Sequence, residues 1–242
     1  MSIFLVGAGP DPLAFPDVFD RFADEVREHA GQGRAARVAI AVHCADENLQ
    51  DVVDAYADPL QDRIECGMAV VPLRSGTPAD PAAFDDVHGL VVGGGLTPAY
   101  WEGLHPVAGA ISRLVTAGVP YLGFSAGAMV APHQAITGGY RIQGVEVCGE
   151  ECSEGLESVD VREGLGLAPF SVDVHAAQAG TLSRAVGAVA AGLTERALAI
   201  DESTTVVLDR AGDREYSVIG TGNCWDIRRT NGGTLVSVRP GE

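Results

Sequence analysis

The sequence predicts a doubly wound α/β fold with a mostly parallel sheet and an antiparallel C-terminal extension. In the first half of the chain, short apolar runs bounded by Gly or Pro alternate with amphipathic helical patterns, as expected for strands buried on both faces of a parallel sheet. From Ala197 onward, strand patterns are separated mainly by turn signals, which indicates antiparallel pairing. With 242 residues, 46% of them hydrophobic, residues 1–242 are expected to form a single domain around one sizeable core.

The individual elements follow from hydrophobic periodicity. The expected strands of the parallel part are Ile3–Val6, Arg37–Val42, Met68–Leu73, Leu90–Val92 and Tyr121–Leu122. The expected helices between them are Pro16–Ala30, about Glu47–Ile64 and Val107–Ala117. The expected later strands are Ala197–Ile200, Thr204–Leu208, Tyr216–Ile219 and Leu235–Val238. The Gly- and Glu-rich stretch at about 138–164 interrupts the α/β alternation, so we expect an inserted hairpin and loop there.

The charged residues exclude several classes of function. The chain has 33 acidic and 16 basic residues, a formal net charge of −17, and all of the basic residues are Arg. A chain without lysine cannot form a lysine Schiff base, use a lysine general base or hold a nucleotide with a Walker-type lysine. The anionic surface disfavours nucleic acid and anionic membranes as partners. The excess acid serves either solubility alone or the selection of a cationic substrate.

Targeting and metal signals are mostly negative. The opening run Met1–Gly7 has no basic n-region and reads as a first strand, not a signal peptide. No apolar stretch approaches the roughly 18 residues needed to span a bilayer, so we expect a cytoplasmic protein. The five cysteines are scattered, and Cys148 and Cys152 lack the CxxC spacing of a zinc site. We therefore expect no metal and no cofactor, and leave open whether the chain forms a homodimer.

The segment Gly123–Gly127, Gly-Phe-Ser-Ala-Gly, has the context of a nucleophile elbow. It follows a strand and opens a helix of small residues, Ala126–Ala131, which is the strand–turn–helix arrangement that holds a serine hydroxyl at the carboxyl edge of a sheet. Backbone N–H groups at the start of that helix lie where an oxyanion would form. The sequence therefore predicts Ser125 as a nucleophile; the alternative is a tight turn in which serine only caps the helix.

A second turn of glycines follows the strand Leu90–Val92 at positions 93–95. Glycine lets the backbone approach a ligand closely and donate N–H bonds. We expect Gly94 or Gly95 to supply an oxyanion donor beside the Ala126 N–H. In contrast, the Gly7-Ala8-Gly9 turn has Pro12 where a dinucleotide-binding motif needs its third glycine.

His175 is the expected general base among six histidines. It ends the strand-like run Phe170–His175, and a residue just beyond the end of a strand shares the sheet edge with the elbow. His133 follows the elbow by only eight residues, at the far end of the same short helix, and is expected to point away from Ser125.

Taken in order, these motifs resemble the S51 serine peptidases, the group of peptidase E and the cyanophycinases. The resemblance extends from about Leu90 to Leu208 and includes the GGG turn, Gly-x-Ser-Ala-Gly-Ala, Val-Asp-x-His, Arg184 and Ile-Asp-Glu-Ser-Thr at 200–204. It implies a class I glutamine amidotransferase-like, flavodoxin-like fold in which serine replaces the amidotransferase cysteine. It also implies the roles of nucleophile for Ser125 and base for His175, with Gly94, Gly95 and Ala126 as oxyanion donors.

The resemblance implies substrate-binding roles for Asp173 and Arg184, yet the chain departs from the family pattern around them. Cyanophycinase-like sequences carry Gln and Phe where this chain has Val174 and Ala176, and further arginines where it has neutral residues. The family's triad acid lies 15–20 residues after the serine, but that window has no carboxylate here. We expect an insertion to displace the acid to Glu151, with Glu146, Glu150 and Glu154 as alternatives.

The expected function is a serine hydrolase that cleaves a peptide or isopeptide bond, including an aspartyl or β-aspartyl bond, of a small peptide-like substrate through an acyl-enzyme. Two alternatives stay open. One is an amide hydrolase acting on a specialised metabolite, which the altered specificity residues permit. The other is a catalytically silent amidotransferase-like binding module, which the absent carboxylate favours.

Overall fold

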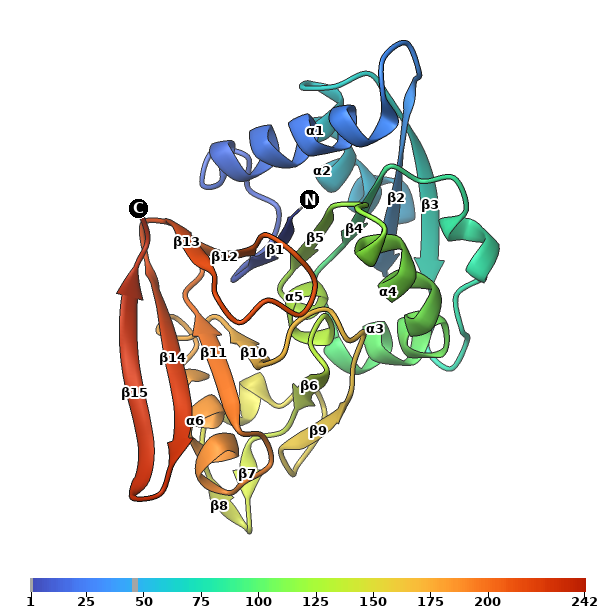
Figure 1. The fold of residues 1–242 in the computed structure, drawn as a ribbon. Coiled ribbons are helices and arrows are strands. Elements are labelled where there is room, and N and C mark those ends of the chain that lie inside the picture. Colours follow the sequence, from blue (N-terminus) through green and yellow to red (C-terminus); the bar gives the residue numbers. More distant parts are fainter. Residues whose placement is uncertain (1, 45–47) are drawn as a thin grey trace.

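The computed structural model describes residues 2–44 and 48–242, and its main sheet is mostly parallel (Figure 1). The strands of this sheet are β1 (Ile3–Val6), β2 (Ala36–His43), β3 (Cys66–Leu73), β4 (Gly89–Val92), β5 (Tyr121–Phe124), β12 (Thr204–Leu208) and β13 (Ser217–Gly220). Their order is β13-β12-β1-β5-β4-β2-β3. Strands β1 to β5 run parallel to one another, while β12 and β13 are antiparallel additions at one edge. The predicted fold class is therefore confirmed.

Helices cover both faces of the main sheet. The α-helices are α1 (Pro16–Ala30), α2 (Leu49–Gln61), α3 (Thr97–Leu104), α4 (Ala108–Thr116), α5 (Ala126–Val130) and α6 (Leu182–Ala190). Along β1, Phe4 and Val6 pack with residues of α1 and α2, while Ile3 and Leu5 pack with residues of α3, α4 and α5. This alternation follows from the two-residue period of a strand, and Figure 1 shows the two helical layers on either side of the sheet.

The start of α2 is set by a side-chain cap. The Asn48 side chain accepts a hydrogen bond from the Gln50 N–H, which satisfies one of the unpaired donors of the first turn. The helix ends at Gln61, three residues before the predicted end. The predicted start at Glu47 lies outside the described residues.

The C-terminal strands form a second sheet as well as the edge of the first. This sheet contains β10 (Ser171–Val174), β11 (Arg196–Ile200), β14 (Asn223–Thr230) and β15 (Gly233–Pro240), in that order. β10 and β11 are parallel, and β14 and β15 are antiparallel additions. β14 is not among the expected strands, because its residues, Asn-Cys-Trp-Asp-Ile-Arg-Arg-Thr, place a buried Asp among the apolar positions.

The buried carboxylate on β14 belongs to Asp226, and it is held by a network of hydrogen bonds. It lies on β14, is 2% exposed and accepts hydrogen bonds from Arg196 of β11, from Arg228 and from the Tyr216 hydroxyl. Burial alone would raise the pKa of Asp226, but the hydrogen bonds from Arg228 and Arg196 lower it well below its ordinary value. The charged network therefore stabilises the ionised form inside the second sheet.

Short paired strands lie in and directly before the stretch predicted as an insertion. β6 (Gln134–Gly138) pairs antiparallel with β9 (Asp160–Glu163), and between them lie the β7–β8 hairpin (Arg141–Ile142 with Val145–Glu146) and the 3-10 helix η3 (Glu150–Cys152). Among the described residues, no helix combines the length and the apolar character needed to cross a membrane.

Candidate active site

The candidate site lies where several strands of the two sheets end. Ser125 follows β5, the glycine turn follows β4, and Gly7 follows β1. His175 follows β10, and its N–H donates to the Gly7 carbonyl at 3.3 Å. Carboxyl ends of parallel strands form the usual binding edge of an open α/β sheet, and here the second sheet delivers His175 to the same edge.

Ser125 occupies a strained turn that its glycine neighbours make room for. Its backbone has φ 46° and ψ −107°, an uncommon conformation for a residue with a side chain. A Cβ on Gly127 would lie 2.3 Å from the Val92 carbonyl oxygen, and one on Gly123 would lie 2.7 Å from the Gly127 backbone. Both flanking positions therefore require glycine, which is the geometry of a nucleophile elbow.

Ser125, His175 and Glu202 form a continuous hydrogen-bonded series. Ser125 Oγ lies 3.0 Å from His175 Nε2, and His175 Nδ1 lies 2.9 Å from Glu202 Oε1. The side chains of His175 and Glu202 are 31% and 46% exposed, so both remain accessible to solvent. The arrangement allows the imidazole to accept a proton from the hydroxyl while the carboxylate holds its other nitrogen.

The structure does not bring the expected acid, Glu151, to His175. Glu151 lies in η3, exposed, with its carboxylate folded over the Gly149 backbone. Among the alternatives, Glu146 pairs with Arg141, and Glu154 accepts the Thr97 N–H at the start of α3.

The position of Glu202 beside His175 has a topological reason. β10 and β11 are parallel neighbours, with Val174 paired to Ile200, so the residues after them lie side by side. His175 follows the first strand and Asp201–Glu202 follow the second. Glu202 lies in the Ile-Asp-Glu-Ser-Thr segment at 200–204, for which the family resemblance implied no catalytic role. Its position after a strand was the signal that could have identified it.

Asp201 is a second residue that the sequence analysis missed. Its carboxylate is 2% exposed; Oδ1 accepts the Ala177 N–H and the Trp225 indole N–H, and Oδ2 accepts the Asn223 N–H and side-chain amide. Asp201 thus ties the loop after His175 to β14. His175 itself has φ 57°, and such strain persists only where surrounding contacts hold it.

The glycine turn is fixed by two tyrosines. The Gly94 N–H donates to the Tyr56 hydroxyl at 2.8 Å, and the Tyr100 hydroxyl donates to the Gly94 carbonyl at 2.8 Å. Of the three expected oxyanion donors, Gly94 is therefore already engaged. In the part of the chain that the structure describes, the N–H groups of Gly95 and Ala126 have no hydrogen-bond partner. A Cβ at Gly94 would lie 3.1 Å from Ser125 Cβ, which shows how closely the turn approaches the serine.

Asp173 and Arg184, expected to bind substrate, instead bind each other. Arg184 Nε and Nη2 donate to the two Asp173 carboxylate oxygens at 2.8 and 2.7 Å, and the side chains are 2% and 0% exposed. Arg184 Nη1 also donates to the carbonyls of Gly139 and Cys152. The pair holds the inserted segment against α6, and neither charge faces an accessible surface.

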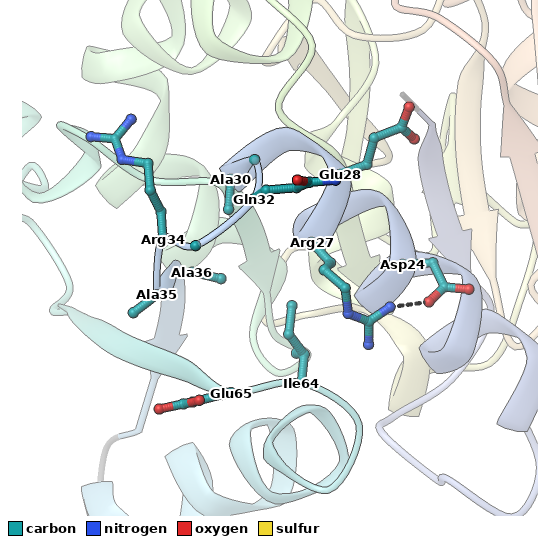
Figure 2. A pocket seen from close by; sticks show the side chains of 12 residues that line it. Asp24, Arg27, Glu28, Ala30, Gln32, Arg34, Ala35, Ala36, Ile64 and Glu65 are labelled. Carbon is teal, nitrogen blue, oxygen red and sulfur yellow. Dashed lines mark hydrogen bonds and ion pairs between the residues drawn. The ribbon is translucent and has the colours of Figure 1, made fainter.

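Two cavities adjoin the site and a third lies far from it. The first, of about 880 Å³, extends from α2 to Gly94 and Gly95, and the second, of about 330 Å³, includes Glu202 in its lining. A cavity of about 970 Å³ lies between the end of α1 and the amino end of β2 (Figure 2), at the opposite edge from Ser125. Among the described residues, no group of three or more His, Cys, Asp or Glu side chains could hold a metal ion.

Comparisons with known proteins give a family and a fold for the chain. A model of the family described as peptidase family S51 matches residues 15–212. The crystal structure of a peptidase from an acI-B1 Actinobacterium is similar over 98% of this chain and 96% of that chain, with a TM-score of 0.61 and 17% sequence identity. A likeness at this identity concerns the fold alone. No curated protein matches the chain.

Proposed function

Because the chain belongs to peptidase family S51, we propose that it is a serine peptidase in which Ser125, His175 and Glu202 form the catalytic triad. The observation that carries the proposal is the series of contacts from Ser125 Oγ to His175 and on to Glu202, at 3.0 and 2.9 Å. The same contacts argue against a catalytically silent binding module, which would have no need to align a base with a strained serine.

The proposed reaction is acyl transfer in two halves. His175 Nε2 accepts the hydroxyl proton as Ser125 Oγ attacks the scissile carbonyl, and then donates that proton to the leaving amine. Water, deprotonated by the same imidazole, releases the acyl group from Ser125. Glu202 holds the Nδ1–H and stabilises the imidazolium that forms in each half.

The oxyanion of the tetrahedral intermediate is proposed to bind the N–H groups of Ala126 and Gly95. Ala126 is the first residue of α5. Gly95 is the last residue of the glycine turn, which lies close to Ser125 at Gly94. Both donors lack partners among the described residues, and donors that are already oriented stabilise developing charge without rearrangement. Gly94 supports the turn through its bond to Tyr56.

The substrate is proposed to be a small peptide, because the two cavities beside the site are of about 880 and 330 Å³. A panel of α-aspartyl, β-aspartyl and neutral dipeptides would establish which bonds are cleaved. The wild type is expected to hydrolyse at least one peptide of the panel, with an acyl-enzyme as intermediate.

The proposal is tested by replacing the nucleophile. Ser125→Ala is expected to abolish hydrolysis and labelling by a fluorophosphonate, whereas Ser183→Ala, an exposed serine on α6, should leave both unchanged. Mass spectrometry of the labelled wild type should place the phosphonate on Ser125. Full activity of Ser125→Ala, or a wild type that does not react with the fluorophosphonate, would exclude the proposed mechanism.

A further inference from the structure

We propose that the substrate carries a positively charged group close to the scissile bond, and that Asp51 on α2 binds this group. The inference rests on the proposed function, because it assigns the cavity beside Ser125 to the substrate. It names the class of substrate that the chemistry of that cavity selects.

The cavity of about 880 Å³ connects α2 to the glycine turn. Asn48, Asp51, Val52, Ala55 and Tyr56 line it, and this spacing places them on one face of the helix. On the other side lie Gly94 and Gly95, and Gly94 is in close contact with Ser125. A substrate whose carbonyl lies at Ser125 can therefore extend along α2.

Asp51 is the charged group of this cavity. Asp51 is the one carboxylate among the described residues of the lining, and none of these residues is Arg. The other titratable side chains of the described lining are His43, Cys44 and Tyr56. Within the described part of the chain, the Asp51 carboxylate has no hydrogen bond or ion pair of its own. The carboxylate is thus free to bind a cation.

The second cavity has the same sign of charge. It shares Pro10 with the first and is lined by Asp11 and Glu202, again without Arg. Asp11 accepts the N–H groups of Leu13 and Ala14 and so is partly engaged in its own turn. Both cavities therefore carry carboxylates and attract a cation.

The cavity joins Asp51 to the glycine turn. Asp51 precedes Tyr56 by five residues on α2, and the Tyr56 hydroxyl accepts a hydrogen bond from the Gly94 N–H at 2.8 Å. All three residues line the same cavity. The Lys or Arg side chain of a substrate whose carbonyl lies at Ser125 can therefore enter this cavity.

The same charges disfavour an aspartyl substrate. A substrate carboxylate in either cavity would face Asp51, Asp11 or Glu202 without an arginine among the described lining residues. Arg184 cannot bind a substrate carboxylate, because its side chain is buried and paired with Asp173. A carboxylate that loses its hydration without gaining a cation binds poorly. The chain therefore differs from the aspartyl preference that the family resemblance implies.

The test compares peptides that differ in one charge. The panel contains X-Leu and Leu-X dipeptides in which X is Lys, norleucine or Asp, and N-acetylated versions that remove the α-ammonium. The wild type is expected to prefer Lys over norleucine by about fivefold in kcat/KM, the upper end for an ion pair with an exposed carboxylate such as that of Asp51. The preference for Lys should persist after acetylation, because the α-ammonium is common to the Lys and norleucine peptides and the compared charge is that of the side chain.

Asp51→Asn should abolish most of this preference. Asp58→Asn makes the same change of charge on the same helix at an exposed position outside the cavity, and it should change the preference by less than twofold. Equal effects of the two variants, or a wild type that prefers Asp to norleucine, would overturn the inference.

A binding measurement separates this inference from the proposed mechanism. Titration calorimetry of Ser125→Ala with the same peptides reports the charge preference without turnover. Tighter binding of the Lys peptide than of the norleucine peptide supports the role of Asp51 even if the hydrolytic mechanism fails. Equal binding of the two peptides contradicts it even if the wild type is an active peptidase.

Discussion

Replacing Glu202 with Gln is expected to lower kcat/KM by about 10- to 100-fold. Gln keeps the size of the side chain and can still accept the His175 Nδ1–H, but it does not neutralise the imidazolium. A hydrogen bond to a charged group contributes about 1.5–3 kcal/mol. Because the Glu202 side chain is 46% exposed, solvent screens part of this interaction. A loss of about 1.4–2.7 kcal/mol corresponds to the stated range and is smaller than the effect of a buried triad acid.

The assay is the steady-state hydrolysis of the best dipeptide by the wild type, Glu202→Gln and Glu151→Gln. The rate of fluorophosphonate labelling gives a second measure of serine reactivity, because it needs the same base. Glu151→Gln is the matched control, since Glu151 lies exposed in η3 and its carboxylate contacts Gly149. It should retain kcat/KM within about twofold, as expected for an exposed side chain outside the site.

Two results would refute this reasoning. An unchanged kcat/KM for Glu202→Gln would mean that the 2.9 Å contact with His175 has no catalytic effect. An equal loss in Glu151→Gln would mean that the inserted segment rearranges to bring Glu151 to the imidazole. Urea unfolding of both variants excludes a general loss of stability as the cause.

Three further variants probe the contacts that support the site. Arg184→Met should destabilise the fold by about 3–5 kcal/mol, because it leaves the buried Asp173 charge unpaired; a loss below about 1 kcal/mol in urea unfolding would contradict this. Asp226→Asn should be less stable than the wild type at pH 7. Because the pKa of Asp226 is lowered in the folded state, the difference should shrink as the pH falls below about 4, and a difference that stays constant would contradict it. Gly127→Ala should lower the free energy of unfolding by about 1–3 kcal/mol, since its Cβ would meet a carbonyl oxygen at 2.3 Å. Gly9→Ala is the control, because its Cβ would have no atom within 4 Å. Equal melting temperatures of the two variants would contradict the prediction.

The features that could be predicted are those that local sequence determines. The elbow around Ser125 needs small residues at fixed offsets from one strand, so a five-residue pattern contains all of its requirements. His175 could be predicted because it follows a recognisable strand. The Tyr56 hydroxyl that binds the Gly94 N–H has no such pattern, because a contact between residues 38 positions apart depends on how α2 packs on the sheet.

The expected acid, Glu151, and the proposed acid, Glu202, follow from two different readings of the sequence, spacing along the chain and adjacency of strands. Distance from the nucleophile was used to locate the acid, but an insertion changes that distance without moving the strands that hold the base. What stays constant in a parallel sheet is adjacency: residues that follow neighbouring strands share one edge. Since Val174 pairs with Ile200, the carboxylate after β11 lies beside His175 whatever the length of the insertion. A sequence argument from strand ends therefore favours Glu202, and the variants Glu202→Gln and Glu151→Gln decide between adjacency and spacing.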